Sequence, residues 1–196
     1  MTFRRTTCPH CRTKLETGQH IHAECIAPWA DAQAEKAKRA EAKKARAAAK
    51  VERASIRARK EAIKTLPDIK AEAQQAFNAF IRARDAGKPC ICCGQPLGMG
   101  DVGGAYDCGH YRSVGSAPHL RYDERNAHAQ RKQCNRWGAG RAVDYRIGLV
   151  ARIGLEAVEA LESDNDPRKW TREELIAIRD TYRAKLKELK GRTDDH

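Results

Sequence analysis

The sequence has little of what builds a large apolar core or a membrane span. Aromatic residues make up 6% of the 196 residues and charged residues 33%, so we expect small modules joined by helix. No apolar run approaches the roughly 18 to 20 residues that span a bilayer. Because Met1–Arg12 also lacks the apolar stretch of a signal peptide, we expect a cytoplasmic protein with no membrane partner.

Acidic residues are outnumbered by basic ones. The chain has 38 Lys and Arg against 26 Asp and Glu, a net charge of +12. Each Lys or Arg on a phosphate releases a condensed counterion, so this excess favours a polyanionic partner, nucleic acid first. The alternative is a protein that is merely basic, because net charge bears on association and not on fold.

Glycine is missing from Pro28 to Arg84, where Ala, Lys, Arg and Glu dominate. These strong helix formers predict one long basic helix, interrupted near Pro67, and then a second helix. The first part, about residues 30–64, has too few large apolar residues to bury a face, so it is expected to be a solvated arm that could lie along DNA or act as a spacer. The second part can dock on a core, because apolar residues recur there at helical spacing: Ile69, Ala73, Ala76, Phe77, Phe80 and Ile81.

Two further helices are expected near the C-terminus. An apolar pattern runs from Val143 to Leu161 and is followed by a break. A last helix is expected to begin with a capping box formed by Thr171 and Glu174 and to end at Lys190, before a glycine. Trp170 and Tyr182 fit packing in this region better than stacking on bases.

Eight cysteines in a cytosolic chain would stay reduced, so their pairing in sequence favours zinc over disulfides. The first group offers four ligands in two close pairs, which suits a tetrahedral structural site with no open position for catalysis. His20 could replace His22 as the third ligand, and unligated thiols on a flexible end are the alternative. The predicted N-terminal ligands are Cys8, Cys11, His22 and Cys25.

The second group combines cysteines with residues suited to phosphodiester hydrolysis. This reaction needs a base that activates water and a divalent ion that polarises the phosphate. His110, at the end of a strand-like run, is a candidate base; a lone histidine would more often be a buried, hydrogen-bonded one. Asn135, at a helix start, could hold the ion, and Asn126 could fix the intervening loop by hydrogen bonds to backbone.

The order of these parts resembles HNH (ββα-metal) nucleases, and the chain as a whole resembles the phage NinG family, also called Rap. The resemblance rests on Asp107-Cys-Gly-His110, His119-Leu-Arg-Tyr, Asn126-Ala-His128, Cys134-Asn135-Arg136 and Asp144 to Gly154. It implies a phage recombination endonuclease, with Mg²⁺ or a similar ion, that cuts branched DNA such as Holliday junctions and D-loops. It also implies a homodimer and, as possible partners, host or phage recombination proteins.

Two departures from the family pattern affect metal binding. Arg131 stands where a second CxxC would begin, so the central zinc site has Cys90, Cys93 and Cys134 in family positions; Cys92, Cys108, His128 or a water could complete it. Gly109 precedes His110 where many HNH sites have a ligand. Asp107 could substitute as the ion's ligand if the strand bends at Gly109, or it could cap a turn.

Together these features predict an α+β, mostly helical chain. The expected parts are a zinc-knuckle module at 1–28, a basic helical arm and docking helix at 29–86, a compact HNH-like module at 87–142 and C-terminal helices at 143–196. Arginines near the site are expected to contact phosphates: Arg112, Arg136, Arg141 and Arg146. The alternatives to a nuclease are a non-catalytic zinc protein that binds DNA or assists recombination, and an RNA-binding zinc protein.

Overall fold

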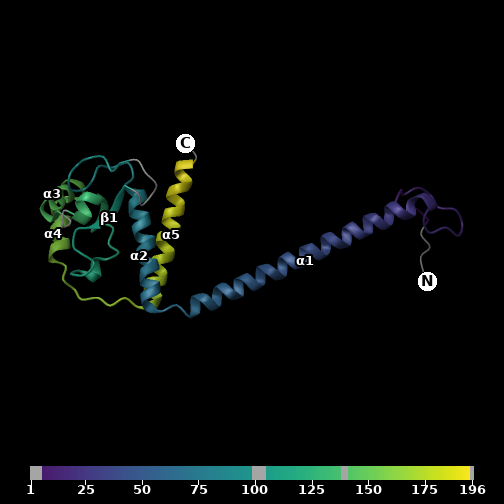
Figure 1. The fold of residues 1–196 in the computed structure, drawn as a ribbon, viewed down its shortest axis with the longest axis horizontal. Helices are drawn as coiled ribbons and strands as arrows, with labels where there is room; N and C mark the ends of the chain where they lie inside the picture. Colours follow the sequence, from purple (N-terminus) through teal and green to yellow (C-terminus); the bar gives the residue numbers. More distant parts are fainter. Residues whose placement is uncertain (1–5, 99–104, 138–140, 195–196) are drawn as a thin grey trace. The chain divides into compact units, whose positions relative to one another are not determined.

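The computed structural model describes residues 6–98, 105–137 and 141–194, and in these ranges the fold is α+β and mostly helical, as predicted (Figure 1). The chain forms two compact units, Met1–Ile63 and Lys64–His196. Across the described ranges, no helix has both the length and the apolar character that crossing a membrane requires.

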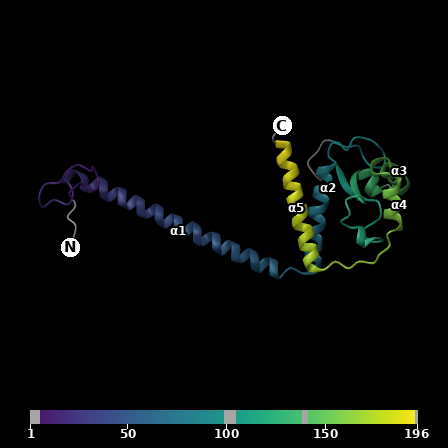
Figure 2. The same ribbon diagram turned by 180° about the vertical axis from the view of Figure 1, so that it is seen from behind.

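The first unit is a small loop module followed by one long helix. Thr7 and Lys14 form an isolated antiparallel bridge, and the 3-10 turn η1 (Ala23–Cys25) leads into α1 (Ile26–Ala62). None of the 37 residues of α1 is buried, and Figure 2 shows it as one unbroken helix. The expectation of a solvated arm is therefore confirmed.

The break after α1 lies slightly before Pro67. Helix α2 (Leu66–Arg84) has this proline in its first turn, where a missing N–H costs nothing. Thr65 and Asp68 form a capping box: the Thr65 amide donates to the Asp68 carboxylate at 2.9 Å, and the Asp68 amide donates to the Thr65 hydroxyl at 3.4 Å. Pro67 therefore begins the second helix and does not itself end the first.

Helices α2 and α5 (Arg172–Asp194) lie side by side in both views (Figures 1 and 2). All six apolar positions predicted to dock are buried in the core that they share. In that core the rings of Phe77 and Tyr182 pack edge to face, with their centroids 4.8 Å apart. Trp170, just before α5, packs on Tyr122 and donates its indole N–H to the Pro118 carbonyl. Trp170 and Tyr182 are therefore packing residues, as expected.

The ends of the C-terminal helices differ in part from the prediction. The capping box of Thr171 and Glu174 is present, but α5 continues through Gly191 to Asp194. The predicted end at Lys190 is wrong, because one glycine costs a helix only about 1 kcal/mol. The pattern from Val143 to Leu161 forms two helices, α3 (Ala142–Ile153) and α4 (Leu155–Ser163). They are divided at Gly154, whose φ of +88° favours glycine.

A two-stranded antiparallel sheet connects the helices. Strand β1 (Tyr106–His110) pairs with β2 (Ala127–Arg131), with His110 opposite Ala127. The 3-10 turn η2 (Pro118–Leu120) lies in the connection between the strands, and the π-helical turn η3 (Gln133–Trp137) follows β2. This pairing places the connecting loop beside the end of β1 and the turn after β2 beside the start of β1.

Candidate metal centres and catalytic site

The four predicted N-terminal ligands come together. The ligand atoms of Cys8, Cys11, His22 and Cys25 all lie within 4.8 Å of one another. Nδ1 of His22 is 3.2 Å from Sγ of Cys11, so His22 and not His20 is the histidine of this group. Three thiols and an imidazole are a typical closed donor set for structural zinc.

The environment of Cys8 favours its thiolate form, whereas burial raises the pKa of Cys25 to about 12. Burial alone would raise the pKa of Cys8, but hydrogen bonds from the backbone amides of His22, Cys11 and His10 outweigh it and lower that pKa to about 6. Metal ligation requires the deprotonated thiol, so a residue that is already ionised near neutral pH suits a cation. The residues present therefore fit zinc.

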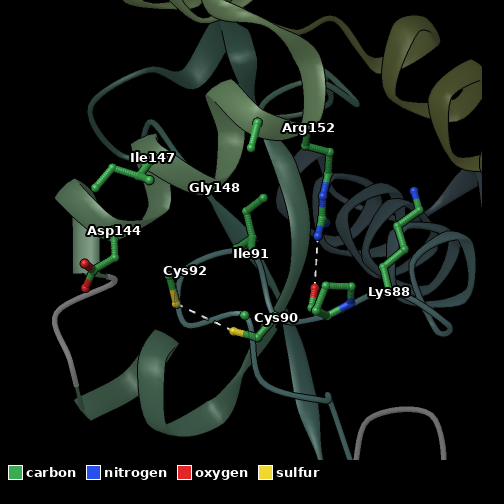
Figure 3. A pocket seen from close by; sticks show the side chains of 11 residues that line it. Lys88, Cys90, Ile91, Cys92, Asp144, Ile147, Gly148 and Arg152 are labelled. Atoms are coloured by element: carbon green, nitrogen blue, oxygen red, sulfur yellow. Dashed lines mark hydrogen bonds between the residues drawn. The ribbon is translucent and has the colours of Figure 1, made fainter.

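A second cluster gathers four thiols in the other unit: Cys90, Cys92, Cys93 and Cys134. All four sulfur atoms lie within 4.8 Å of one another, and Figure 3 shows the 3.6 Å approach of Cys90 and Cys92. Backbone hydrogen bonds outweigh the effect of burial and lower the pKa of Cys90 to about 7. This cluster could also hold a metal such as zinc.

Of the alternatives for the fourth central ligand, the structure favours Cys92. Cys108 is buried in the apolar core against α2. His128 lies with its Nδ1 3.4 Å from the Asp85 carboxylate, and its Nε2 donates to the Arg125 carbonyl at 3.2 Å. Arg131 takes part through its backbone, because its N–H donates to Sγ of Cys90 at 3.3 Å.

Helix α3 packs directly against the loop that carries these cysteines. A Cβ atom added at Gly148 would lie 1.7 Å from the carbonyl oxygen of Ile91, so only glycine permits this approach. Arg152, one turn further along α3, donates to the Pro89 carbonyl at 2.9 Å. Beside this contact is a pocket of about 460 Å³ that also borders Cys90 and Cys92 (Figure 3).

Asn126 closes the loop between the two strands. Its side chain is fully buried, and its Oδ1 accepts from the Arg112 amide at 2.8 Å. Its Nδ2 donates to the carbonyls of Arg112 at 3.0 Å and Leu120 at 3.1 Å. The prediction that Asn126 fixes the loop through backbone hydrogen bonds is confirmed.

His110 is oriented by that same loop. Its Nε2 lies 3.1 Å from the carbonyl oxygen of Arg121, the residue after Leu120. A carbonyl can only accept, so Nε2 carries the proton and the neutral ring has its lone pair on Nδ1. Burial lowers the pKa of His110 below its usual 6.5, which keeps the ring neutral at pH 7.

His110 and Asn135 line one pocket of about 340 Å³, together with Cys108, Tyr111, Ser113, Val114, Ala142 and Tyr145. Asn135 lies inside the short turn η3 and not at the start of a longer helix, since α3 begins at Ala142. Cys134 in the same turn joins the thiol cluster, so the thiol cluster fixes the position of this turn.

Asp107 is connected to the pocket through Asn135. Nδ2 of Asn135 donates to Asp107 at 3.2 Å, and Arg136 forms a two-point ion pair with the same carboxylate at 2.9 and 3.2 Å. Burial would raise the pKa of Asp107, but Arg136 and Asn135 outweigh it and lower that pKa. The carboxylate is therefore ionised and already faces a cation.

The strand does not bend at Gly109. The β1–β2 pairing runs through this residue, which lies opposite His128. A Cβ atom at Gly109 would lie 2.1 Å from Oε1 of Gln130, which gives glycine a packing reason at this position. The bend that would bring Asp107 to the face of His110 is thus not found in this strand.

The four arginines predicted to contact DNA already have partners within the protein. Arg112 donates to the carbonyls of Leu161 and Asp164, and the other three pair with carboxylates. The side chains of those three are 41% to 59% exposed, whereas Arg112 is half-buried. Contact with phosphate stays a prediction for all four arginines: Arg112, Arg136, Arg141 and Arg146.

Sequence reasoning did not identify Asp85, and it placed Tyr145 only in the apolar pattern of a helix. Asp85 is fully buried; its carboxylate pairs with Arg84 at 2.8 Å and accepts the Ala129 amide at 3.1 Å. It thereby anchors β2 to the end of α2. Tyr145 donates its hydroxyl to the Gly109 carbonyl at 2.9 Å and supports the end of β1. No local pattern reveals either hydrogen-bonding role, because both roles depend on tertiary contacts.

Comparison with known proteins gives a consistent relationship over nearly the whole chain. A family model described as "Bacteriophage Lambda NinG protein" matches residues 2–192. The chain is 42% identical over 182 residues to "Protein ninG" of Salmonella phage P22, covering 93% of this chain and 82% of that protein. It is 42% identical over 183 residues to "Protein ninG" of Escherichia phage lambda, with the same coverage, and 45% identical over 136 residues to that of Escherichia phage 933W, covering 69% and 65%. No solved structure matches.

Proposed function

The chain belongs to the phage NinG family, and on that premise and the geometry around His110 we propose that it is a metal-dependent DNA endonuclease of the ββα-metal (HNH) type. The proposed module consists of β1, the loop closed by Asn126, β2 and the turn that carries Asn135. The two thiol centres would hold structural zinc in this proposal.

One observation carries the proposal. Asn126 holds the Leu120 carbonyl, and the next carbonyl, that of Arg121, accepts the Nε2 proton of His110. This fixes both the orientation and the tautomer of His110, so that Nδ1 is the nitrogen that can take a proton from water. A histidine held in this way, neutral at pH 7 and lining a pocket, is suited to be a general base.

Asn135, which lines the same pocket as His110, would hold the catalytic ion. Carboxylate and amide oxygens are the ligands that Mg²⁺ prefers, but β1 does not bend at Gly109, so the Asp107 carboxylate stays on the face opposite His110, paired with Arg136. When bound, the ion would polarise the phosphate and neutralise charge on the leaving oxygen. Asp107 would instead position Asn135 by accepting a hydrogen bond from its Nδ2.

The finer parts of the proposal rest on the resemblance and not on contacts. Branched DNA, such as Holliday junctions and D-loops, is the proposed substrate, and a homodimer is proposed because resolving a junction takes two cuts. Host or phage recombination proteins are possible partners. A phage-encoded protein with this activity would act in the cytoplasm of the bacterial host.

The test is nicking of a synthetic four-way DNA junction. We expect the wild type to cut with Mg²⁺, to stop in EDTA and to resume when Mg²⁺ is added back, whereas His110→Ala does not cut. His119→Ala is the matched control, because His119 is also a buried histidine whose Nε2 donates to a carbonyl, that of Asp164. Cutting that is absent from the wild type would make the protein a non-catalytic zinc protein, and equal cutting by the two variants would show that His110 is not the base.

A further inference from the structure

Helix α1 carries a regular row of basic residues that the proposed catalytic site does not use. The helix has eleven Lys and Arg against five Asp and Glu, a net charge of +6. Eight of the basic residues follow one another at alternating steps of three and four. We define these as the basic stripe: Lys36, Arg39, Lys43, Arg46, Lys50, Arg53, Arg57 and Lys60.

Helix geometry places the whole stripe on one side of α1. At 3.6 residues per turn, steps of three and four keep the eight side chains within an arc of about 120°. Glu41 and Glu52 fall on the opposite side by the same count. All eight stripe residues are exposed, and the exposed ion pair of Arg39 with Glu35, at 2.9 Å, lies near its N-terminal end.

The spacing of the stripe suits a duplex. At 1.5 Å per residue the stripe is about 36 Å long. One turn of B-DNA has nearly the same length, about 34 to 36 Å. Duplex DNA presents one charge about every 1.7 Å of its axis, with both strands counted, so phosphates recur along the whole length of the stripe. No base-reading geometry is needed, because contacts to the backbone carry no sequence information.

The composition of the rest of the helix argues against other partners. A helix that lies on a membrane surface needs a face of large apolar residues opposite its charges, and the side opposite the stripe carries Ala, Ser55, Lys44, Arg59 and the two glutamates. A coiled coil needs apolar residues at the positions that alternate by three and four, and here those positions are Lys and Arg.

We propose that the basic stripe of α1 is a binding surface for the phosphate backbone of duplex DNA, distinct from the cutting site. The inference takes DNA as the partner from the proposed function and names the surface that holds it. It predicts binding that does not depend on sequence and weakens steeply with salt.

The test compares two triple variants of the full chain in the His110→Ala background, where cutting cannot interfere. The stripe variant is Lys43→Gln, Lys50→Gln and Arg57→Gln. Its matched control is Lys38→Gln, Lys44→Gln and Arg59→Gln, which removes the same charges from the same helix outside the stripe. Glutamine is a good helix former, and circular dichroism checks that α1 persists in both.

The measurement is binding to a 30-base-pair duplex over a range of salt concentrations. With about 0.9 counterions released per phosphate contact, the stripe variant should have a salt slope shallower by about 2.7 and, at 0.15 M salt, roughly hundredfold weaker binding. The control should change the slope by less than about 1. Equal losses of duplex binding in the two variants would overturn the proposal that the stripe is the binding surface.

Two further outcomes separate this inference from the proposed nuclease. If the wild type never cuts but the stripe variant alone loses duplex binding, the stripe stands and the nuclease fails. If the wild type cuts but both variants bind the duplex as their parent does, the stripe fails and the nuclease stands. Stripe-dependent binding to phosphatidylserine vesicles, without stripe-dependent binding to the duplex, would also overturn it.

Discussion

Replacing Asn126 by alanine should both destabilise the protein and slow cutting. The change removes three hydrogen bonds from a fully buried side chain to the backbone of Arg112 and Leu120. At about 1 kcal/mol each, the free energy of unfolding should fall by about 3 kcal/mol. Because the loop also holds the carbonyl that orients His110, the rate of nicking at saturating DNA should fall while the affinity for DNA stays the same.

Urea unfolding measures the first effect, as a lower midpoint with an unchanged slope, and single-turnover nicking measures the second. Asn126→Asp should be at least as damaging as Asn126→Ala, because a carboxylate cannot donate to the two carbonyls. Asn165→Ala is the control, since its amide is exposed and its loss should cost less than about 1 kcal/mol. A loss below about 1 kcal/mol for Asn126→Ala, or an unchanged nicking rate, would refute the reasoning.

Three more predictions concern metal, packing and pH. Metal analysis should find about two zinc ions per chain, falling to about one in Cys92→Ser and unchanged in Cys108→Ser, because only Cys92 lies in the thiol cluster; equal zinc in both variants would contradict this assignment. Gly148→Ala should lower the urea midpoint by the equivalent of about 1 to 3 kcal/mol, because its Cβ would overlap the Ile91 carbonyl; an unchanged midpoint would show that α3 does not pack there. Because burial lowers the pKa of His110, the base stays neutral as the pH falls through 6.5, and the nicking rate should decline only below that pH; a decline centred above 6.5 would exclude His110 as this base.

Local patterns in the sequence were sufficient for the parts that depend on near neighbours. The apolar spacing of α2 predicted its buried face because helical periodicity decides which side chains share a side. The capping box of Thr171 and Glu174 and the closure of the loop by Asn126 were predictable for a similar reason: a polar side chain next to unpaired backbone groups tends to satisfy them.

The parts that were not predictable depend on the path of the chain in space. Spacing alone could not choose Cys92 over Cys108 or His128, because all three lie near the cluster in sequence and only tertiary packing turns two of them away. Arg131 was an apparent defect in the central centre, yet its backbone N–H supports Cys90. Asp85 gave no signal because its burial results from packing between α2 and β2.

The central claim, that Nδ1 of His110 accepts the proton during cutting, can be tested by chemical rescue. Single-turnover nicking of a four-way junction would be measured for His110→Gly with Mg²⁺ and increasing imidazole, beside the wild type under the same conditions. We expect imidazole, which can enter the pocket of about 340 Å³, to restore cutting in the variant in proportion to its concentration and to leave the wild type unchanged. No restoration, or equal stimulation of both proteins, would contradict the assignment of His110 as the base.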